Sequence, residues 1–112
     1  MKRALFIGRW QPLHAGHKWL FNQKLEKDIP ILIAVRDTPV NEKNPYSTKE
    51  VIKNLKKEYE TEIKSNMVKV ISIPDIESVN YGRGVGYEIN EFEPPKDIGK
   101  ISATEIRNNL KK

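Results

Sequence analysis

The apolar positions of this sequence fall into short runs and helical stripes that alternate along the chain. Apolar segments over residues 3–7 and 29–35, together with a weakly alternating segment over 67–73, predict three strands. Between the first two segments, residues 16–27 have the spacing of a helix with an apolar side. The chain therefore begins with the order strand, helix, strand.

A second helix is predicted to begin near Ser47. Ser47 and Glu50 have the spacing of a capping box, in which the hydroxyl accepts from a backbone amide and the carboxylate reaches back. Residues 87–92 predict a short fourth strand, and a second capping box at Ser102 predicts a final helix. The second helix carries one apolar stripe, made of Val51, Ile52, Leu55 and Tyr59.

The order strand, helix, strand, helix, strand predicts an α/β fold with an open parallel sheet, flanking helices and right-handed crossovers. At 112 residues the chain is expected to form a single domain over residues 1–112. The composition, 38% hydrophobic and 31% charged, is typical of a soluble globular protein and not of a disordered one.

The net charge of the chain and its lack of targeting signals indicate which ligands and which cell compartment to expect. The formal net charge of +5 favours polyanionic ligands, either nucleic acid or charged small molecules such as nucleotides, and composition does not choose between them. No apolar run approaches the roughly twenty residues of a membrane span, and no signal-like segment is present, so a cytoplasmic protein without membrane contact is expected. The absence of cysteine excludes a disulfide framework.

The stretch between the first strand and the first helix carries the candidate chemistry. The apolar run stops at Gly8, and two histidines, His14 and His17, follow with Gly16 between them. Residues three apart share a face of a helical turn, so the two imidazoles can reach one small volume. The exposed amides and positive dipole end of the helix start make a seat for phosphate. No third or fourth ligand accompanies the pair, so a protein-held metal is not expected.

Two motifs resemble one enzyme family. The order His14-Ala15-Gly16-His17 resembles the H-x-G-H signature of the nucleotidyltransferase superfamily, which includes adenylyl- and cytidylyltransferases. The preceding residues 9–12 are similar to the G-R-F-Q-P wording of archaeal-type nicotinamide mononucleotide adenylyltransferases, and residues 101–107 resemble the second signature, I-S-x-T-x-x-R. The resemblance spans nearly the whole sequence and implies a Rossmann-like open parallel sheet with flanking helices.

The resemblance also implies a reaction. A nucleoside monophosphate would pass from ATP to a phosphorylated acceptor, by in-line attack of the acceptor phosphate and without a covalent enzyme intermediate, with release of pyrophosphate. A phosphate nucleophile is already ionised at neutral pH, so the enzyme needs positioning and charge stabilisation more than a general base. Magnesium would be bound to the triphosphate of the substrate. Cytidylyl transfer from CTP to an alcohol or sugar phosphate remains an alternative, although many cytidylyltransferases carry Thr-Phe-Asp where this chain has residues 9–11.

The roles of individual residues follow from the same resemblance. The expected catalytic residues are His14, His17 and Arg107. The expected nucleotide contacts are Gly8, Arg9, Trp10, Gly16, His17, Gly82, Arg83, Ser102, Thr104 and Arg107, and the expected acceptor contacts are Arg36 and Lys43.

Several of these residues have simpler alternatives. Trp10 can equally belong to the core, and Arg36, Lys43 and Arg83 can be ordinary solvated charges on loops. Ser102 can cap its helix without contacting a ligand. These alternatives stay open at the level of sequence.

Two rival functions and an assembly state complete the expectations. A nucleic-acid-binding module is permitted by the basic charge and the interleaved aromatic residues, and a catalytically silent nucleotide-binding protein of the same fold is the other rival. A homo-oligomer, most simply a symmetric dimer, is expected because a small single sheet would leave Trp19, Phe21 and Phe92 uncovered.

Overall fold

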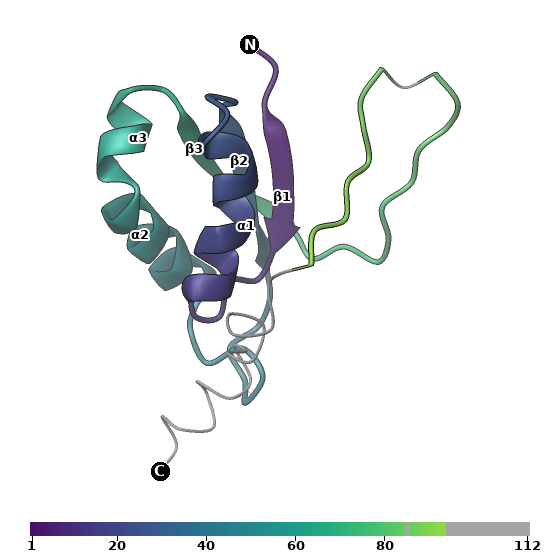
Figure 1. Cartoon of the computed structure of the whole chain (residues 1–112). Helices are drawn as coiled ribbons and strands as arrows, with labels where there is room; N and C mark the ends of the chain where they lie inside the picture. Colours follow the sequence, from purple (N-terminus) through teal and green to yellow (C-terminus); the bar gives the residue numbers. More distant parts are fainter. Residues whose placement is uncertain (85, 94–112) are drawn as a thin grey trace.

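A computed structural model describes residues 1–84 and 86–93 of the chain. The described residues form the elements β1 (Ala4–Gly8), α1 (Ala15–Leu25), β2 (Ile31–Asp37), α2 (Thr48–Glu58), α3 (Glu60–Lys64) and β3 (Val68–Pro74) (Figure 1). The alternation of strand and helix confirms the predicted α/β fold, a Rossmann-like open parallel sheet with flanking helices.

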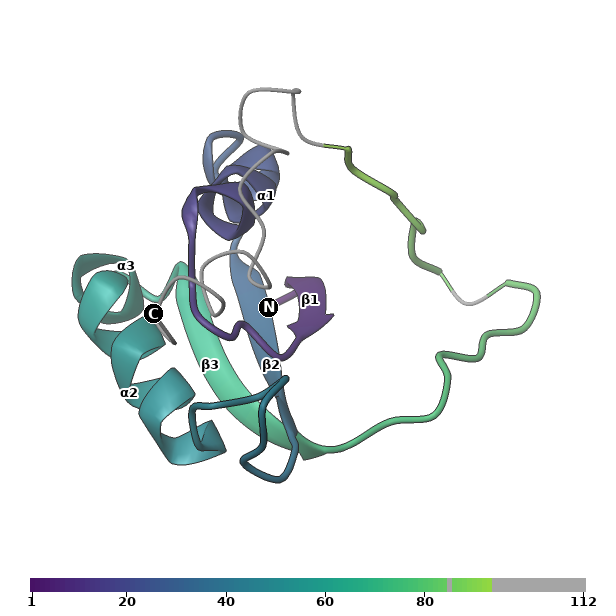
Figure 2. The same ribbon diagram turned by 90° about the horizontal axis from the view of Figure 1, so that it is seen from below.

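The three strands pair in the order β1-β2-β3, and both pairings are parallel. Gly8 of β1 lies opposite Val35 of β2, which lies opposite Ser72 of β3. The carboxyl ends of the strands therefore meet at one edge of the sheet, where open α/β folds bind ligands. The helices lie on one side of the sheet, and the segment after β3 extends beyond β1 on the other side (Figure 2).

The hydrophobic core lies between the sheet and these helices. Burial of apolar area is the main term that holds such a layer together. The predicted stripe of α2 faces it, because Val51 and Leu55 are buried and Tyr59 is buried just after the helix. The buried core residues are Phe6, Trp10, Phe21, Ile31, Ile33, Val35, Val51, Leu55, Tyr59 and Val68.

The structure corrects one premise of the expected dimer. Phe21 is completely buried within this chain, where its ring meets Phe6 and Tyr59 edge-on. Phe21 therefore exposes no apolar surface for a partner to cover, whereas Trp19 and Phe92 stay partly exposed. The homo-oligomer itself stays a prediction.

The predicted fourth strand is wrong. Residues 87–92 have no strand pairing, and Tyr87 and Ile89 are 58% and 61% exposed. A strand needs a neighbour to pair its backbone groups, and the segment lies in the loop that extends away from the sheet (Figure 1). The predicted final helix, which begins near Ser102, lies outside the described residues.

The start of α2 follows the predicted cap in part. The Ser47 hydroxyl oxygen accepts a hydrogen bond from the Glu50 amide at 3.1 Å, as a helix N-cap should. The Ser47 hydroxyl also donates to the Glu50 carboxylate at 3.2 Å, so the carboxylate bonds the side chain of the cap. The helical segment is broken at Tyr59, whose φ of −108° and ψ of 28° separate α2 from α3.

The glycine that ends β1 generates a testable prediction. A methyl group on Gly8 would lie 2.9 Å from two carbon atoms of the Trp10 indole, which is too close for either group. Because Trp10 is held in the core, we expect Gly8→Ala to lower the free energy of unfolding by about 1–3 kcal/mol. Equilibrium unfolding in urea measures this difference in the free energy of unfolding. Gly82→Ala is the matched control, since nothing lies near that position, and an equal loss in both variants would contradict the packing.

Candidate active site

The two histidines of the H-x-G-H stretch lie at the carboxyl edge of the sheet. The turn from β1 into α1 carries them, and His14 is the N-cap of α1 with extended backbone angles of φ −142° and ψ 178°. His17 lies on the first turn of the same helix. The imidazole rings stack with their centres 3.7 Å apart and their planes at 24°. The sequence-based expectation that both rings share one small volume is met in the structure.

The two imidazoles form the cap of α1 themselves. The Gly16 amide donates to His14 Nδ1 at 3.0 Å, and the His14 amide donates to His17 Nδ1 at 3.4 Å. This is a reciprocal capping box in which histidines take the places usually held by serine or threonine and by glutamate. Each Nδ1 therefore acts as an acceptor, so each neutral ring carries its proton on Nε2.

This cap changes the phosphate seat that the sequence indicated. The Gly16 amide was expected to be one of the exposed donors at the helix start, but it is used by the His14 ring. Within residues 1–84 and 86–93, neither imidazole Nε2 has a hydrogen-bond partner. The donors that this turn can offer to an anion are therefore the two Nε2–H groups, beside the positive end of the α1 dipole.

Burial keeps both rings neutral. It lowers the pKa of His17 to about 3, with the neighbouring His14 as a second cause, and it lowers the pKa of His14 as well. Near neutral pH the rings therefore act as hydrogen-bond donors without a positive charge. The pair is suited to stabilising charge that develops on phosphate oxygens, and not to donating protons from an imidazolium.

Trp10 occupies the core, which was the alternative left open by the sequence. Its side chain is 6% exposed, and its indole N–H donates to the Ala34 carbonyl of β2 at 3.2 Å. The indole meets the rings of Phe21 and His17 edge-on, each with centres 4.9 Å apart. Trp10 therefore contacts the candidate site only from the core side, where its ring meets His17. The neighbouring Arg9 is exposed.

Gln11 is a structural residue of the site that sequence reasoning missed. Its amide group makes two hydrogen bonds with the backbone of Tyr46, donating to the carbonyl at 2.7 Å and accepting from the amide at 2.9 Å. These bonds tie the turn after β1 to the segment that precedes α2. A buried glutamine between Trp10 and Pro12 was the available signal, but only the fold shows which backbone it meets.

The proposed acceptor-binding residues lie after β2 and at its end. Arg36 is half-buried and already holds a partner, because its Nε and Nη2 atoms donate to one carboxylate oxygen of Asp75 at 2.9 and 2.6 Å. Lys43 is exposed in a turn whose backbone is held by the Asn41 side chain. Both lie on the side of the sheet where the strands end. Within residues 1–84 and 86–93, neither forms a hydrogen bond or an ion pair with the histidines.

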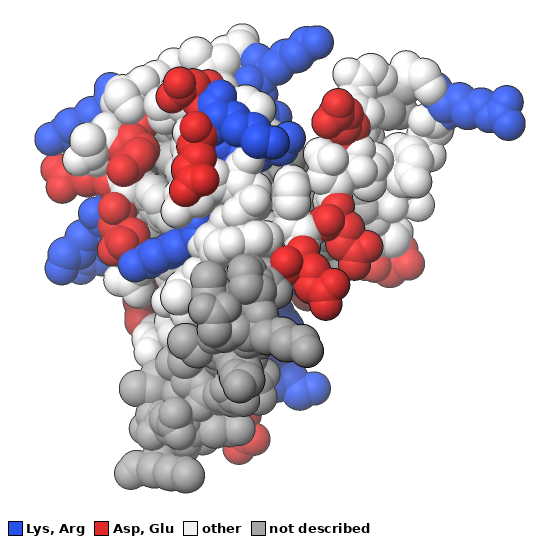
Figure 3. Space-filling view, viewed as in Figure 1, with Lys and Arg blue, Asp and Glu red and all other residues white. Residues whose placement is uncertain are grey.

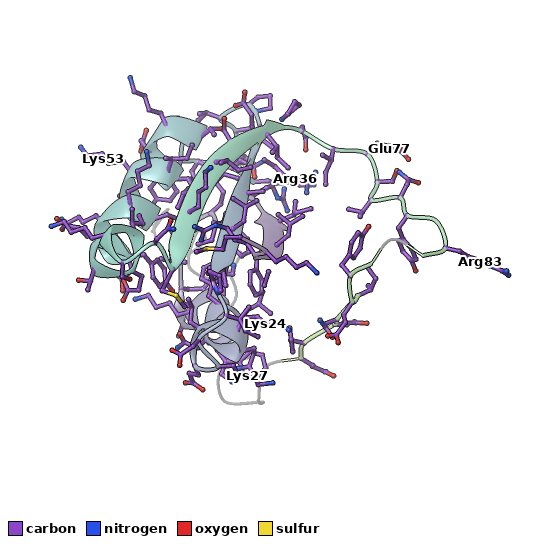
Figure 4. The ribbon with its side chains drawn as sticks, turned by 90° about the horizontal axis from the view of Figure 1, so that it is seen from above. Lys24, Lys27, Arg36, Lys53, Glu77 and Arg83 are labelled. Atoms are coloured by element: carbon purple, nitrogen blue, oxygen red, sulfur yellow. The ribbon has the colours of Figure 1, made fainter. Side chains whose placement is uncertain are left out.

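Of the remaining predicted residues, the structure describes Gly82 and Arg83, which do not lie beside the histidines. Gly82 and Arg83 are exposed, and Arg83 lies at the tip of the extended loop and points away from the sheet, far from Arg36 (Figure 4). Ser102, Thr104 and Arg107 lie outside the described residues. Their expected contacts with the nucleotide therefore stay predictions.

The described part of the chain has no cluster of three or more His, Cys, Asp and Glu side chains that could hold a metal ion. Among the same residues, no helix combines the length and hydropathy that crossing a membrane requires.

The neutral state of His17 generates a prediction about stability and pH. An unfolded chain binds a proton on this imidazole near pH 6.5, but the folded chain binds it only near pH 3. Between these values the unfolded state holds more protons, so stability falls as the pH is lowered through this window. We expect the Tm to fall more between about pH 7 and about pH 5 in the wild type than in His17→Gln. Equal falls in the two proteins would show that His17 titrates normally.

Comparisons with known proteins relate the chain to enzymes of one name. No protein-family model matches the chain. The nicotinamide-nucleotide adenylyltransferase of Pyrobaculum neutrophilum is 35% identical over 101 residues, which cover 88% of this chain and 55% of that protein. The enzymes of the same name from Caldivirga maquilingensis and Pyrobaculum aerophilum are 33% and 35% identical over 81 residues, which cover 70% of this chain and 46% of each.

The chain spans about half the length of the curated relatives it matches. These similarities, together with the α/β fold, show that the chain is related to the nicotinamide-nucleotide adenylyltransferases and thereby to the nucleotidyltransferase superfamily.

Proposed function

We propose that this chain transfers the adenylyl group of ATP to a phosphorylated small molecule and releases pyrophosphate. The observation that carries the proposal is the pair of stacked, neutral imidazoles at the start of α1, each with its Nε2–H available at the carboxyl edge of the sheet. The names of the relatives favour ATP as the donor and make a nicotinamide nucleotide the first acceptor to test. The single domain over residues 1–112 is part of the same proposal.

In this proposal His14 and His17 stabilise the transition state by hydrogen bonding. As the acceptor phosphate attacks the α-phosphorus of ATP in line, negative charge grows on the non-bridging oxygens and on the departing pyrophosphate. Two fixed Nε2–H donors can meet that charge without reorganising, which is the arrangement that lowers such barriers most. The acceptor phosphate forms the new P–O bond as the bond to pyrophosphate breaks, so no protein nucleophile or general base is needed.

Other residues would bind and orient the phosphates. Arg9 is exposed beside the histidine turn, and a guanidinium there can hold a phosphate with two parallel hydrogen bonds. Arg107, Ser102 and Thr104 are proposed to add contacts from outside the described residues. Magnesium is proposed to arrive with the triphosphate as part of the substrate.

Arg36 and Lys43 are proposed to meet the acceptor phosphate. Asp75 already occupies the Arg36 guanidinium through Nε and Nη2. Contact with an acceptor would therefore require either the remaining donors of Arg36 or release from Asp75, whereas Lys43 is exposed and needs no such release.

Three alternatives compete with this proposal. Cytidylyl transfer from CTP would use the same histidine pair. A catalytically silent nucleotide-binding protein would bind ATP without producing pyrophosphate. A nucleic-acid-binding module is less well supported, because lysine and arginine side chains are interspersed with acidic ones over the helices on the face shown in Figure 3.

The experiment is a panel of ATP and CTP crossed with phosphorylated acceptors, including nicotinamide mononucleotide, read by pyrophosphate release. We expect release with ATP and a phosphorylated acceptor together. His14→Asn and His17→Asn should each lower kcat about a hundredfold, because one lost transition-state donor costs about 3 kcal/mol. The asparagine amide oxygen can replace Nδ1 as the acceptor in the cap, whereas the shorter side chain carries no donor at the position of Nε2.

Lys53→Gln is the matched control, because Lys53 is an exposed charge on α2 that lies away from the histidine turn (Figure 4). It should leave kcat within about twofold of the wild type. Retention of full activity in a folded His17→Asn protein would remove His17 from the mechanism. ATP binding without pyrophosphate under any acceptor would favour the silent nucleotide-binding alternative.

A further inference from the structure

Trp10 has an unusual backbone conformation for a large aromatic residue. Its φ is 52°, in the left-handed region that bulky side chains rarely adopt. Such a conformation is strained and persists only where the surroundings fix it. An aromatic residue that only filled the core would not require this conformation, since Phe6 and Phe21 fill the same core from a strand and a helix.

The contacts of the indole explain what the conformation achieves. The left-handed turn after Gly8 folds the indole back against the end of β1, where the lack of a Cβ on Gly8 leaves room for it. The indole N–H is then anchored to the Ala34 carbonyl of β2 at 3.2 Å. Phe21 packs against the ring edge-on, with centres 4.9 Å apart and planes at 61°. The ring is therefore held from the sheet and from α1 at once.

The held indole meets His17. The two rings lie at 89° with centres 4.9 Å apart, while His14 stacks on His17 with centres 3.7 Å apart. His17 is thus confined by two rings of different orientation, and its Nδ1 accepts from the His14 amide. That hydrogen bond is long, at 3.4 Å, so it is a weak restraint on the ring by itself. The indole supplies the additional restraint.

We propose that Trp10 is a positioning residue, which holds the His17 ring so that Nδ1 faces the His14 amide and Nε2–H is presented to the phosphates. This inference rests on the proposed function of His17 but concerns a different residue. Trp10 would act through His17 and would not touch the substrate, because it is 6% exposed and its N–H is already bonded to Ala34. Any contact of Trp10 with the nucleotide would then come from its backbone, and this contact stays a prediction.

The first measurement uses the unaltered protein without substrate. Long-range ¹H–¹⁵N spectra distinguish the two imidazole nitrogens and show which one carries the proton. We expect His17 to be in the Nε2–H form at neutral pH, with nuclear Overhauser contacts between its ring protons and those of the Trp10 indole. A His17 ring that averages between both tautomers, or that shows no contact with the indole, would overturn the proposal whatever any variant does.

The second measurement compares three variants in the same spectra. Trp10→Met removes the ring and fills much of its space with a flexible side chain. Trp10→Phe restores an aromatic ring without the N–H. Phe6→Met is the matched control, because Phe6 is 8% exposed in the same core and its ring meets Phe21, while no ring contact with His17 is found for it among the described residues.

We expect the tautomers of His17 to mix in Trp10→Met, to return to Nε2–H in Trp10→Phe, and to stay Nε2–H in Phe6→Met. In pyrophosphate release, Trp10→Met should lower kcat at least about tenfold with little change in KM, since a misplaced catalytic group mainly loses transition-state contacts. Equal effects of Trp10→Met and Phe6→Met on the tautomer and on kcat would show that Trp10 has only a packing role.

The outcomes separate this inference from the proposed function. The tautomer is read without substrate, so a chain that produces no pyrophosphate still tests whether Trp10 holds His17. A fixed Nε2–H tautomer that is lost in Trp10→Met, in a chain without activity, would support the positioning role and contradict the enzyme. Activity with an averaged His17 ring would contradict the positioning role alone.

Discussion

Two hydrogen bonds between backbone amides and imidazole Nδ1 atoms hold the first turn of α1 and fix the chemistry that it can offer. The Gly16 amide donates to His14, and the His14 amide donates to His17. Together these two bonds cap the helix, hold the rings where they stack and assign the proton of each neutral ring to Nε2. The same contacts cap the helix and place the two imidazoles of the candidate site. A substitution of either histidine therefore affects both the helix cap and the site.

The rest of the site depends on the surroundings of that turn. Parallel pairing of β1 with β2 brings the end of β1 to the edge where the loop after β2 begins. Gln11 then ties the turn to the backbone of Tyr46 through two hydrogen bonds of 2.7 and 2.9 Å. Burial within this framework lowers the pKa of His17 to about 3 and keeps the ring uncharged. A neutral Nε2–H at the positive end of a helix dipole can donate a hydrogen bond to a polyphosphate although the ring itself carries no charge.

Much of the fold and part of the site follow from sequence. Apolar runs and caps predicted β1, α1, β2, α2 and β3, with ends displaced by one or two residues, because periodicity marks the buried centre of an element better than its ends. The fourth strand failed because alternation over 87–92 does not supply a partner strand.

The finer features of the site depend on tertiary contacts that no local pattern encodes. The spacing of His14 and His17 predicted that they meet, but their mutual capping depends on the side-chain rotamers that the fold selects. The sequence around Trp10 does not show whether its ring turns toward the ligand or into the core. The Asp75 partner of Arg36 lies 39 residues away along the chain, and strand pairing alone brings them together.

We propose that the Nε2–H groups of His14 and His17 form the phosphate site. The most direct test follows the imidazole resonances of both residues in ¹H–¹⁵N spectra while ATP and magnesium are added, with ³¹P spectra as an independent record of binding. Both Nε2–H signals are expected to shift together and to saturate with the same ATP concentration as the phosphorus signals. Phosphorus signals that report binding while both imidazoles stay unchanged would contradict this proposal.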